Sequence, residues 1–110
     1  MEYKQVDDII IINAPESVDV EEAKVFTNFF QYFLSNGFRK FVINFSKTKF
    51  ISSAFLSALV SFHSKLIKME GNIVLSSISF TVRRVLEITD LSSLFLSFTD
   101  DNEAINYFSS

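Results

Sequence analysis

The chain contains no cysteine, so it can form no disulfide framework and offers neither a thiol nucleophile nor a cysteine metal site. It also has no tryptophan, and only two glycines and one proline occur among its 110 residues. So few turn-forming residues leave little room for long loops or for a linker between domains. We therefore expect a single domain over residues 1–110, and the lack of cysteine is compatible with the reducing cytoplasm.

A large excess of one charge and long apolar runs are also missing. The net charge is −3 and the lysines and arginines form no cluster, so we expect no nucleic-acid partner. The longest apolar run, Ile9 to Ile12, is far too short to cross a bilayer. The first eight residues, MEYKQVDD, are polar and acidic, unlike a secretory signal. We expect a cytoplasmic protein with no direct membrane insertion.

Residues suited to catalysis are scarce. His63 is the only histidine, and its spacing places it toward the apolar face of a helix, which favours a packed side chain over a general base. The two glycines lie far apart, so they form no phosphate-cradling loop. We expect a protein that is not an enzyme and that has no cofactor or metal site. A small α/β enzyme or nucleotide binder is the alternative from a different class.

Apolar, β-branched runs alternate with stretches of helical spacing along the chain. Asp19 and Glu22 have the spacing of a capping box at the start of the first helix, and Gly37 and Gly71 are expected to end the first two helices. The runs predict strands over residues 2–6, 8–13, 40–46, 72–77 and 94–99. The helical stretches predict helices that start after Asp19, at about Ser53, after Ser79 and after Asp100, and that end near residues 36, 69, 89 and 108.

This order of elements indicates the fold class. Strands joined through helices need right-handed crossovers and a largely parallel sheet. We therefore expect an α/β domain with a four- to five-stranded, mostly parallel sheet and about four helices. Any functional site would lie at the carboxyl ends of the strands.

The segment KFISSAFLSALVSF, residues 49–62, places two adjacent hydroxyls at the start of the second helix. Either Ser52 or Ser53 can accept a hydrogen bond from a backbone N–H of the first turn and so cap the helix. A serine at this place is also a potential target for modification, because the helix terminus tolerates an added negative charge. Both uses can coexist, with one serine capping and the other modified.

Three segments together resemble the STAS domain family, the fold of anti-sigma-factor antagonists that is also found in sulfate transporters. FVINFSKTKFISSAFLSALVSFHSKLIKMEGNIVL, residues 41–75, resembles the central motif, in which a strand is followed by Asp-Ser-Ser-Gly-Leu and a helix. ESVDVEEA, residues 16–23, resembles the loop before the first helix, and VRRVLEITDLSSLF, residues 82–95, resembles the family's Val-x-x-Val-Leu-x-x-Thr-Gly-Leu segment. The resemblance covers nearly the whole chain and implies a single STAS domain.

The resemblance implies roles for particular residues. Ser53 occupies the position of the serine that an ATP-dependent kinase, itself an anti-sigma factor, phosphorylates in the family, with Ser52 as the alternative target. Ser52 itself takes the place of the family's Asp, and Phe55 that of its glycine. Asn44 stands where the strand usually ends in Asp. Both nearby carboxylates of the family pattern are therefore absent.

The implied function is that of an anti-sigma-factor antagonist in a bacterial partner-switching system that regulates transcription. The unmodified form would bind the anti-sigma factor/serine kinase, and phosphorylation would prevent binding. The alternative, favoured by the loss of both carboxylates, is a degenerate STAS scaffold or adaptor that is never phosphorylated and acts beside a transporter or in a signalling assembly. The residues expected to rim the partner-binding surface are Asp19, Asn44, Ser52, Phe55 and Ser57.

Phe55, Phe62 and Met69 form an apolar stripe along the second helix. One interpretation is that the apolar face is simply wide, or that the first helix covers the stripe. The other is an exposed strip beside Ser53 that anchors a partner. An exposed strip would also allow a homodimer through this helix.

Overall fold

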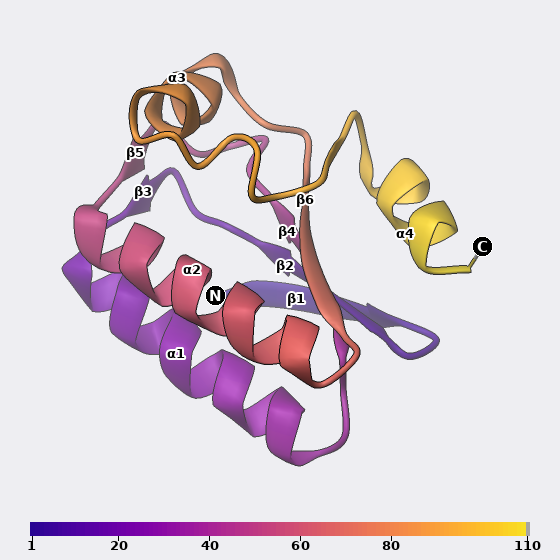
Figure 1. Ribbon diagram of the computed structural model, residues 1–110. Helices are drawn as coiled ribbons and strands as arrows, with labels where there is room; N and C mark the ends of the chain where they lie inside the picture. Colours follow the sequence, from indigo (N-terminus) through magenta and orange to yellow (C-terminus); the bar gives the residue numbers. More distant parts are fainter. Residues whose placement is uncertain (110) are drawn as a thin grey trace.

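The computed structural model describes residues 1–109, in which helices lie on both sides of a central sheet (Figure 1). The sheet has five strands in the order β1-β2-β4-β6-β7. These strands are β1 (Glu2–Val6), β2 (Ile9–Asn13), β4 (Lys40–Asn44), β6 (Asn72–Ser76) and β7 (Ser97–Phe98). The helices are α1 (Val20–Ser35), α2 (Ser53–Lys68), α3 (Phe80–Ile88) and α4 (Asp101–Ser109).

Strand β1 pairs antiparallel with β2, and the other neighbouring strands of this sheet pair parallel. The two-residue turn of the β1–β2 hairpin is Asp7-Asp8, and Asp7 takes the left-handed conformation with φ 54°. The observed sheet and four helices confirm the expected α/β fold.

Alternation along the strands divides the apolar residues between two faces of the sheet. Ile10 and Ile12 belong to the larger core beneath α1 and α2, whereas Ile9 and Ile11 belong to a smaller core that includes Ala104 of α4. Figure 1 shows α1 and α2 side by side on one side of the sheet and α4 on the other. The run of four isoleucines is thus covered on both faces, as expected for a central strand.

A second, two-stranded sheet is absent from the sequence-based prediction. It pairs β3 (Ser17–Val18) with β5 (Phe50–Ile51) in parallel. Two residues are too few to show a period, which explains why the pattern missed them. The last predicted strand, 94–99, shrinks to β7 because Leu94 and Leu96 are exposed and only Phe95 between them enters the core.

The two glycines act differently at the ends of α1 and α2. Gly37 has φ 92° and its N–H donates to the Leu34 carbonyl, so it ends α1 as predicted. The left-handed residue after α2 is Glu70, with φ 62°, and not Gly71. Gly71 is required for space instead, because a Cβ there would clash with the Arg39 carbonyl oxygen. Helix α2 ends just before Gly71, as predicted, and the Gly71 N–H donates to the Leu66 carbonyl over 2.8 Å.

Candidate functional site at the start of α2

The N-termini of α1 and α2 lie side by side because each helix follows one strand of the small sheet. Val18 of β3 is the register partner of Ile51 of β5. One residue further on, the Ser52 N–H donates to the Val18 carbonyl over 2.9 Å. Asp19 and Ser52 therefore stand at neighbouring helix starts, although 33 residues of sequence separate them.

Ser52 caps α2, and Ser53 does not. The Ser52 Oγ accepts a hydrogen bond from the Phe55 N–H at 3.2 Å, with the extended backbone that a cap residue needs. Ser53 is the first residue of the helix, and its side chain is exposed. This confirms the capping interpretation for Ser52 and leaves the neighbouring hydroxyl accessible from solvent.

The first turn of α2 carries no acidic residue. The unpaired backbone N–H groups and the positive end of the helix dipole are therefore not compensated by charge from within the helix. The N-terminus of α1 differs, because Asp19 caps it and Glu21 and Glu22 lie in its first turn. An added anion is better accommodated electrostatically at α2 than at α1.

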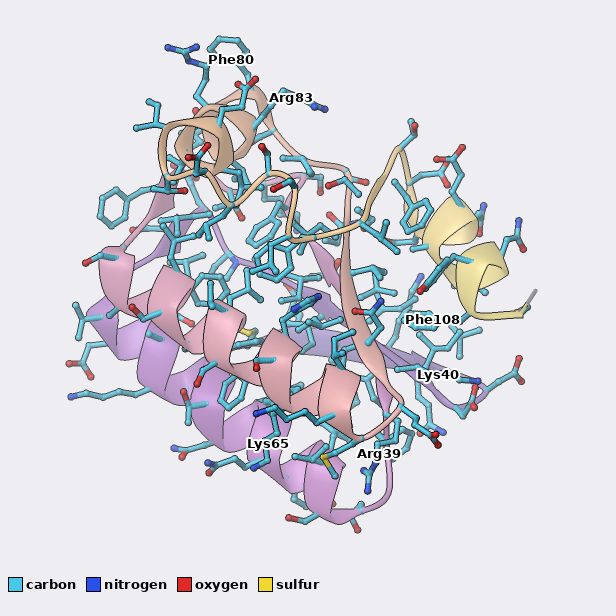
Figure 2. All side chains as sticks on the ribbon, viewed as in Figure 1. Arg39, Lys40, Lys65, Phe80, Arg83 and Phe108 are labelled. Carbon is cyan, nitrogen blue, oxygen red and sulfur yellow. The ribbon has the colours of Figure 1, made fainter. Side chains whose placement is uncertain are left out.

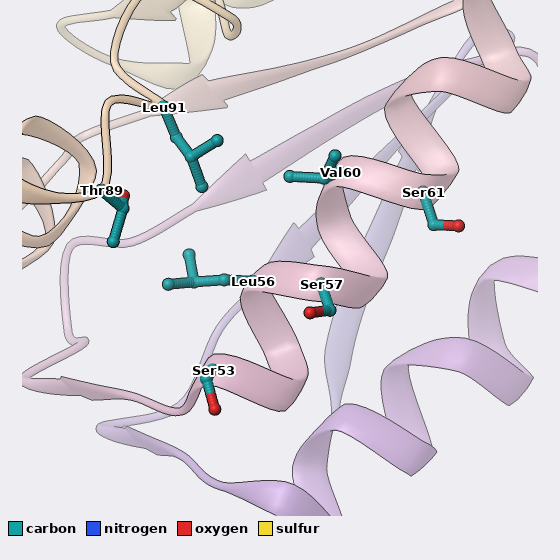
Figure 3. A pocket seen from close by; sticks show the side chains of 7 residues that line it. All are labelled: Ser53, Leu56, Ser57, Val60, Ser61, Thr89 and Leu91. Atoms are coloured by element: carbon teal, nitrogen blue, oxygen red, sulfur yellow. The ribbon is translucent and has the colours of Figure 1, made fainter.

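A shallow groove of about 430 Å³ runs beside Ser53, between α2 and the end of α3. Asp90 ends α3 with φ 63°, and the following Leu91 borders the groove opposite α2. Figure 3 shows Leu56 and Val60 pointing from α2 towards Leu91. The groove lining consists of Ser53, Leu56, Ser57, Val60, Ser61, Thr89 and Leu91.

The contribution of α3 to this groove is not predicted by the sequence. Thr89 and Leu91 belong there only to the segment that resembles the family. Their position opposite α2 depends on the turn at Asp90, where a non-glycine residue takes the left-handed conformation. No periodicity signals such a turn, whereas the family resemblance of residues 82–95 was the available hint.

Phe55 is fully buried, which overturns its predicted role at the rim of a partner surface. Its ring lies 4.9 Å from that of Phe26 and 6.1 Å from that of Phe45, measured between centroids. Phe62 of the same stripe stacks on Phe30 at 4.1 Å. Helix α1 supplies Phe26 and Phe30 and covers these two rings, whereas Met69 at the far end of the stripe is 37% exposed. The exposed strip is therefore wrong, and a homodimer through Phe55 and Phe62 of the second helix loses its basis.

Asn44 is not brought together with the serines. Side chains alternate along β4, and Asn44 faces α4, on the side of the sheet opposite α2. Its Nδ2 donates to the Asp101 Oδ1 over 3.0 Å, and its Oδ1 accepts from the Ser46 N–H over 2.9 Å. The buried Ser76 hydroxyl donates to the same carboxylate oxygen over 2.6 Å. Asn44 thus joins the sheet to α4 and is occupied by these contacts.

Of the other predicted rim residues, Asp19, Ser52 and Ser57 do lie around Ser53. Asp19 is exposed while its Oδ1 accepts from the Glu22 N–H over 2.9 Å. Ser57 is exposed one turn after Ser53 and lines the same groove. The structure therefore assembles a polar rim of hydroxyls and one carboxylate around the start of α2.

His63 is half-buried and packs edge-on against Phe95, with 5.0 Å between ring centroids. Burial lowers the pKa of the imidazole below its usual value. This environment agrees with the packed histidine expected from the sequence. Within residues 1–109, no group of three or more His, Asp and Glu side chains is arranged to hold a metal ion.

None of the helices within residues 1–109 has the length and apolar character needed to span a membrane.

Comparison with known proteins identifies the family. Residues 1–104 match the STAS domain, and the chain belongs to that family. A protein of Thermotoga neapolitana, provisionally named an anti-sigma factor antagonist, is 29% identical over 104 residues, which cover 94% of this chain and 92% of the relative. The homologous Thermotoga maritima protein has the same identity and coverage.

Solved structures agree with this assignment. The crystal structure of the Thermotoga maritima protein superimposes with a TM-score of 0.90 at 28% identity and covers 99% of this chain and 94% of that one. SpoIIAA, an anti-sigma factor antagonist, gives 0.86 in its unphosphorylated form at 18% identity, covering 98% and 95% of the two chains. Its phosphorylated form, from Bacillus, gives 0.79 at 17% identity, with 97% of each chain covered. The chain is thus a STAS domain of the anti-sigma-factor-antagonist type, and SpoIIAA supports the fold.

Proposed function

We propose that this protein is a cytoplasmic, non-catalytic regulator that binds an anti-sigma factor/serine kinase and is released when Ser53 is phosphorylated. The observation that carries the proposal is the division of roles between two adjacent serines. Ser52 is engaged as the helix cap, whereas Ser53 is exposed at the first position of α2. A kinase can reach the Ser53 hydroxyl without disturbing the cap.

The groove beside Ser53 supplies a docking surface. Leu56, Val60 and Leu91 form its apolar part, and the hydroxyls of Ser53 and Ser57 border it. Burial of apolar side chains favours association, provided that the polar border keeps its hydrogen bonds. Asp19 and Ser52 extend the border towards α1. Phe55 and Asn44 leave the proposed contact set because they are occupied inside the protein.

Phosphorylation would change the charge of this surface without a change of fold. A phosphoserine carries about −1.5 to −2 charges at pH 7. The N–H groups at the start of α2 would stabilise this charge in the unbound protein, since no acidic residue occupies that turn. Docking would bring the same charge against an apolar or acidic partner surface, where the loss of hydration is unfavourable. Phosphorylation thus lowers the free energy of the unbound protein and raises that of the complex. The partner therefore dissociates.

The similar proteins support the proposal of a regulatory protein that is controlled by phosphorylation. The Thermotoga proteins carry the provisional name of anti-sigma factor antagonists. SpoIIAA exists in phosphorylated and unphosphorylated forms on the same fold. A regulatory protein partner for this chain follows by analogy with these proteins.

The modification is tested with serine kinases of the anti-sigma type encoded in the same genome. Each kinase is incubated with the protein and ATP, and the phosphorylated residue is located by mass spectrometry. We expect one phosphate on Ser53, its loss in Ser53→Ala, and its retention in Ser52→Ala. A phosphate on Ser52 alone, or on neither serine with any of the kinases, contradicts the proposed switch.

The effect on binding is tested with the same kinases immobilised. Ser53→Ala is expected to bind as the unmodified protein does, and Ser53→Asp at least about tenfold more weakly, a change of about 1.4 kcal/mol. Ser64→Asp is the matched control, because it adds the same charge to an exposed serine further along α2. An equal loss with Ser64→Asp would show that net charge, and not position, governs binding.

A second candidate is a STAS scaffold that is never phosphorylated. The loss of both carboxylates of the family pattern favours it, because Ser52 and Asn44 stand where the motif that the sequence resembles has Asp. For a scaffold, Ser53→Asp and Ser53→Ala would capture the partner equally well. That result, together with an unmodified Ser53, would select the scaffold over the switch.

A further inference from the structure

Strand β1 leaves one edge of the main sheet unpaired. It occupies the end of the strand order and pairs only with β2. Among residues 1–109, no other strand pairs with the outer edge of Glu2–Val6. An edge of five residues presents N–H and C=O groups in a row, which makes it a template for another strand.

An aromatic cluster borders this edge on the α1 side of the sheet. Tyr3 lies 5.0 Å from Phe29 and 5.1 Å from Phe33, and Tyr32 lies 5.1 Å from Phe33, all between ring centroids. Tyr3 is 50% exposed and Tyr32 is 64% exposed, although Phe33 beneath them is buried. Exposed tyrosines over a buried phenylalanine are typical of protein interfaces rather than of ordinary surface.

Two opposite charges lie on the other side of the same edge. Glu2 and Lys4 alternate with Tyr3, so both side chains face the α4 side of the sheet, and both are exposed. Neither has an ion-pair partner within the described residues. A lone lysine on an edge strand discourages pairing, whereas Glu two residues from Lys makes the edge complementary to itself.

We propose that a second copy of this chain pairs antiparallel with β1, with the twofold axis at Tyr3. In this register Glu2 of each copy lies opposite Lys4 of the other, and the two Tyr3 side chains meet at the axis. The cross-strand pairs then carry opposite charges, which is favourable. The two aromatic clusters join into one on the α1 side of a ten-stranded sheet.

Symmetry leaves few alternative registers. Two copies related by a twofold axis perpendicular to the sheet must pair residues that face the same side. Centring the pair on Glu2 or on Lys4 would oppose two like charges, and centring it on Gln5 would leave Glu2 unpaired. The register at Tyr3 is the one that satisfies both charges and uses the aromatic cluster.

The dimer would leave the groove beside Ser53 accessible. Strand β1 is at one edge of the sheet, whereas α3 borders the groove and leads into β7 at the opposite edge. The inference is therefore independent of the proposed switch. A standard protein interface buries about 1,600 Å², and one strand pair with one cluster buries less, so we expect a weak dimer that forms at high concentration.

Charge reversal tests the dimer by sedimentation velocity between 5 and 500 μM protein. The unmodified chain should shift from monomer towards dimer, and Glu2→Lys or Lys4→Glu alone should each weaken dimerisation at least about tenfold. The double variant Glu2→Lys/Lys4→Glu restores the opposite pairs and should dimerise again. Lys65→Glu, on the outer surface of α2 (Figure 2), is the control that changes net charge away from the edge. A monomer throughout, or a double variant no better than the single ones, overturns the proposal.

The absence of native cysteine permits a direct test of the register. Tyr3→Cys places two thiols opposite each other, within the span of Cα distances that a disulfide bridges. Gln5→Cys is the control on the same edge and face, where the two cysteines would lie about 13 Å apart, four residues along the strand. Mild oxidation should link the Tyr3→Cys chains and leave Gln5→Cys largely unlinked. Equal linking of both variants, or linking of Gln5→Cys alone, would exclude the register centred on Tyr3.

Discussion

Helices α1 and α2 begin in the same way and then differ at each position of the first turn. Both are 16 residues long, and both follow one strand of the two-stranded sheet. Asp19 and Ser52 cap them with the same bond, to the N–H three residues later. The first helical residue is Val20 in α1 and Ser53 in α2. The third helical residue is the acidic Glu22 in α1 and the buried Phe55 in α2.

The comparison shows how one geometry serves two purposes. The N-terminus of α1 is compensated by acidic residues and carries no modifiable hydroxyl at its first position. The N-terminus of α2 is anchored to the core by the buried Phe55, and its solvent-facing side can accommodate an anion at the exposed Ser53. Because core packing fixes the position of α2, the solvent-facing residues of its first turn are not needed to hold the helix in place. They are therefore available for regulation.

The largest expected change in the free energy of unfolding concerns the third residue of each helix, Phe55 in α2 and Glu22 in α1. Phe55→Ala should destabilise the fold by about 3–5 kcal/mol, because it removes a fully buried ring that contacts Phe26 and Phe45. Glu22→Ala, at the matching position of α1, should cost about 0.3–1 kcal/mol, because it removes only an acid from the N-terminal turn. Urea unfolding monitored by circular dichroism measures both.

Phe80→Ala is the control for the loss of a phenyl ring. Phe80 is 77% exposed and projects from α3 away from α1 and α2 (Figure 2). Its removal should change the free energy of unfolding by no more than about 0.5 kcal/mol. Similar losses for Phe55→Ala and Phe80→Ala would contradict the assignment of Phe55 to the core.

An intermediate effect is expected at the caps. Asp19→Ala and Ser52→Ala should each cost about 1 kcal/mol, since each removes the side-chain acceptor for an N–H of the first turn. Ser53→Ala should be nearly neutral, because the cap bond belongs to Ser52. Thermal and urea unfolding of the three variants give the comparison. A loss at Ser53 equal to that at Ser52 would mean that the two hydroxyls share the cap.

Elements marked by a continuous apolar run or by a capping pair could be predicted from the sequence. The four isoleucines of β2 and the capping pair Asp19 and Glu22 gave a strand and a helix start at the observed places. The division of roles at Ser52 and Ser53 could only be stated as alternatives, because both residues are serines and both positions suit a cap. The observed bond to the Phe55 N–H decides it.

The errors came from facts that one segment cannot show. Helical spacing placed Phe55 and Phe62 on one stripe, but their burial depends on Phe26 and Phe30 of α1, which lie about 30 residues earlier. Asn44 was assigned to the rim from a motif position, without the partner on α4 that occupies its amide. Spacing within a helix predicts which side chains share a face, and only the neighbouring element determines whether that face is covered.

The smallest expected effect is also the most direct measure of the difference between the two helix starts. Ser53→Asp should stabilise the unbound protein by about 0.3–1 kcal/mol, because it adds a negative charge to an N-terminal turn that has none. Val20→Asp, compared in a Lys24→Ala background so that no i,i+4 ion pair forms, makes the same addition at the first position of α1. Asp19, Glu21 and Glu22 already compensate that helix N-terminus, so the gain should be smaller there. Urea unfolding at low ionic strength measures both, and salt should reduce the difference since both side chains are exposed. Equal stabilisation by the two substitutions would show that the existing acids of α1 leave its N-terminus as receptive to an anion as that of α2, and the electrostatic reason for placing the switch at Ser53 would fail.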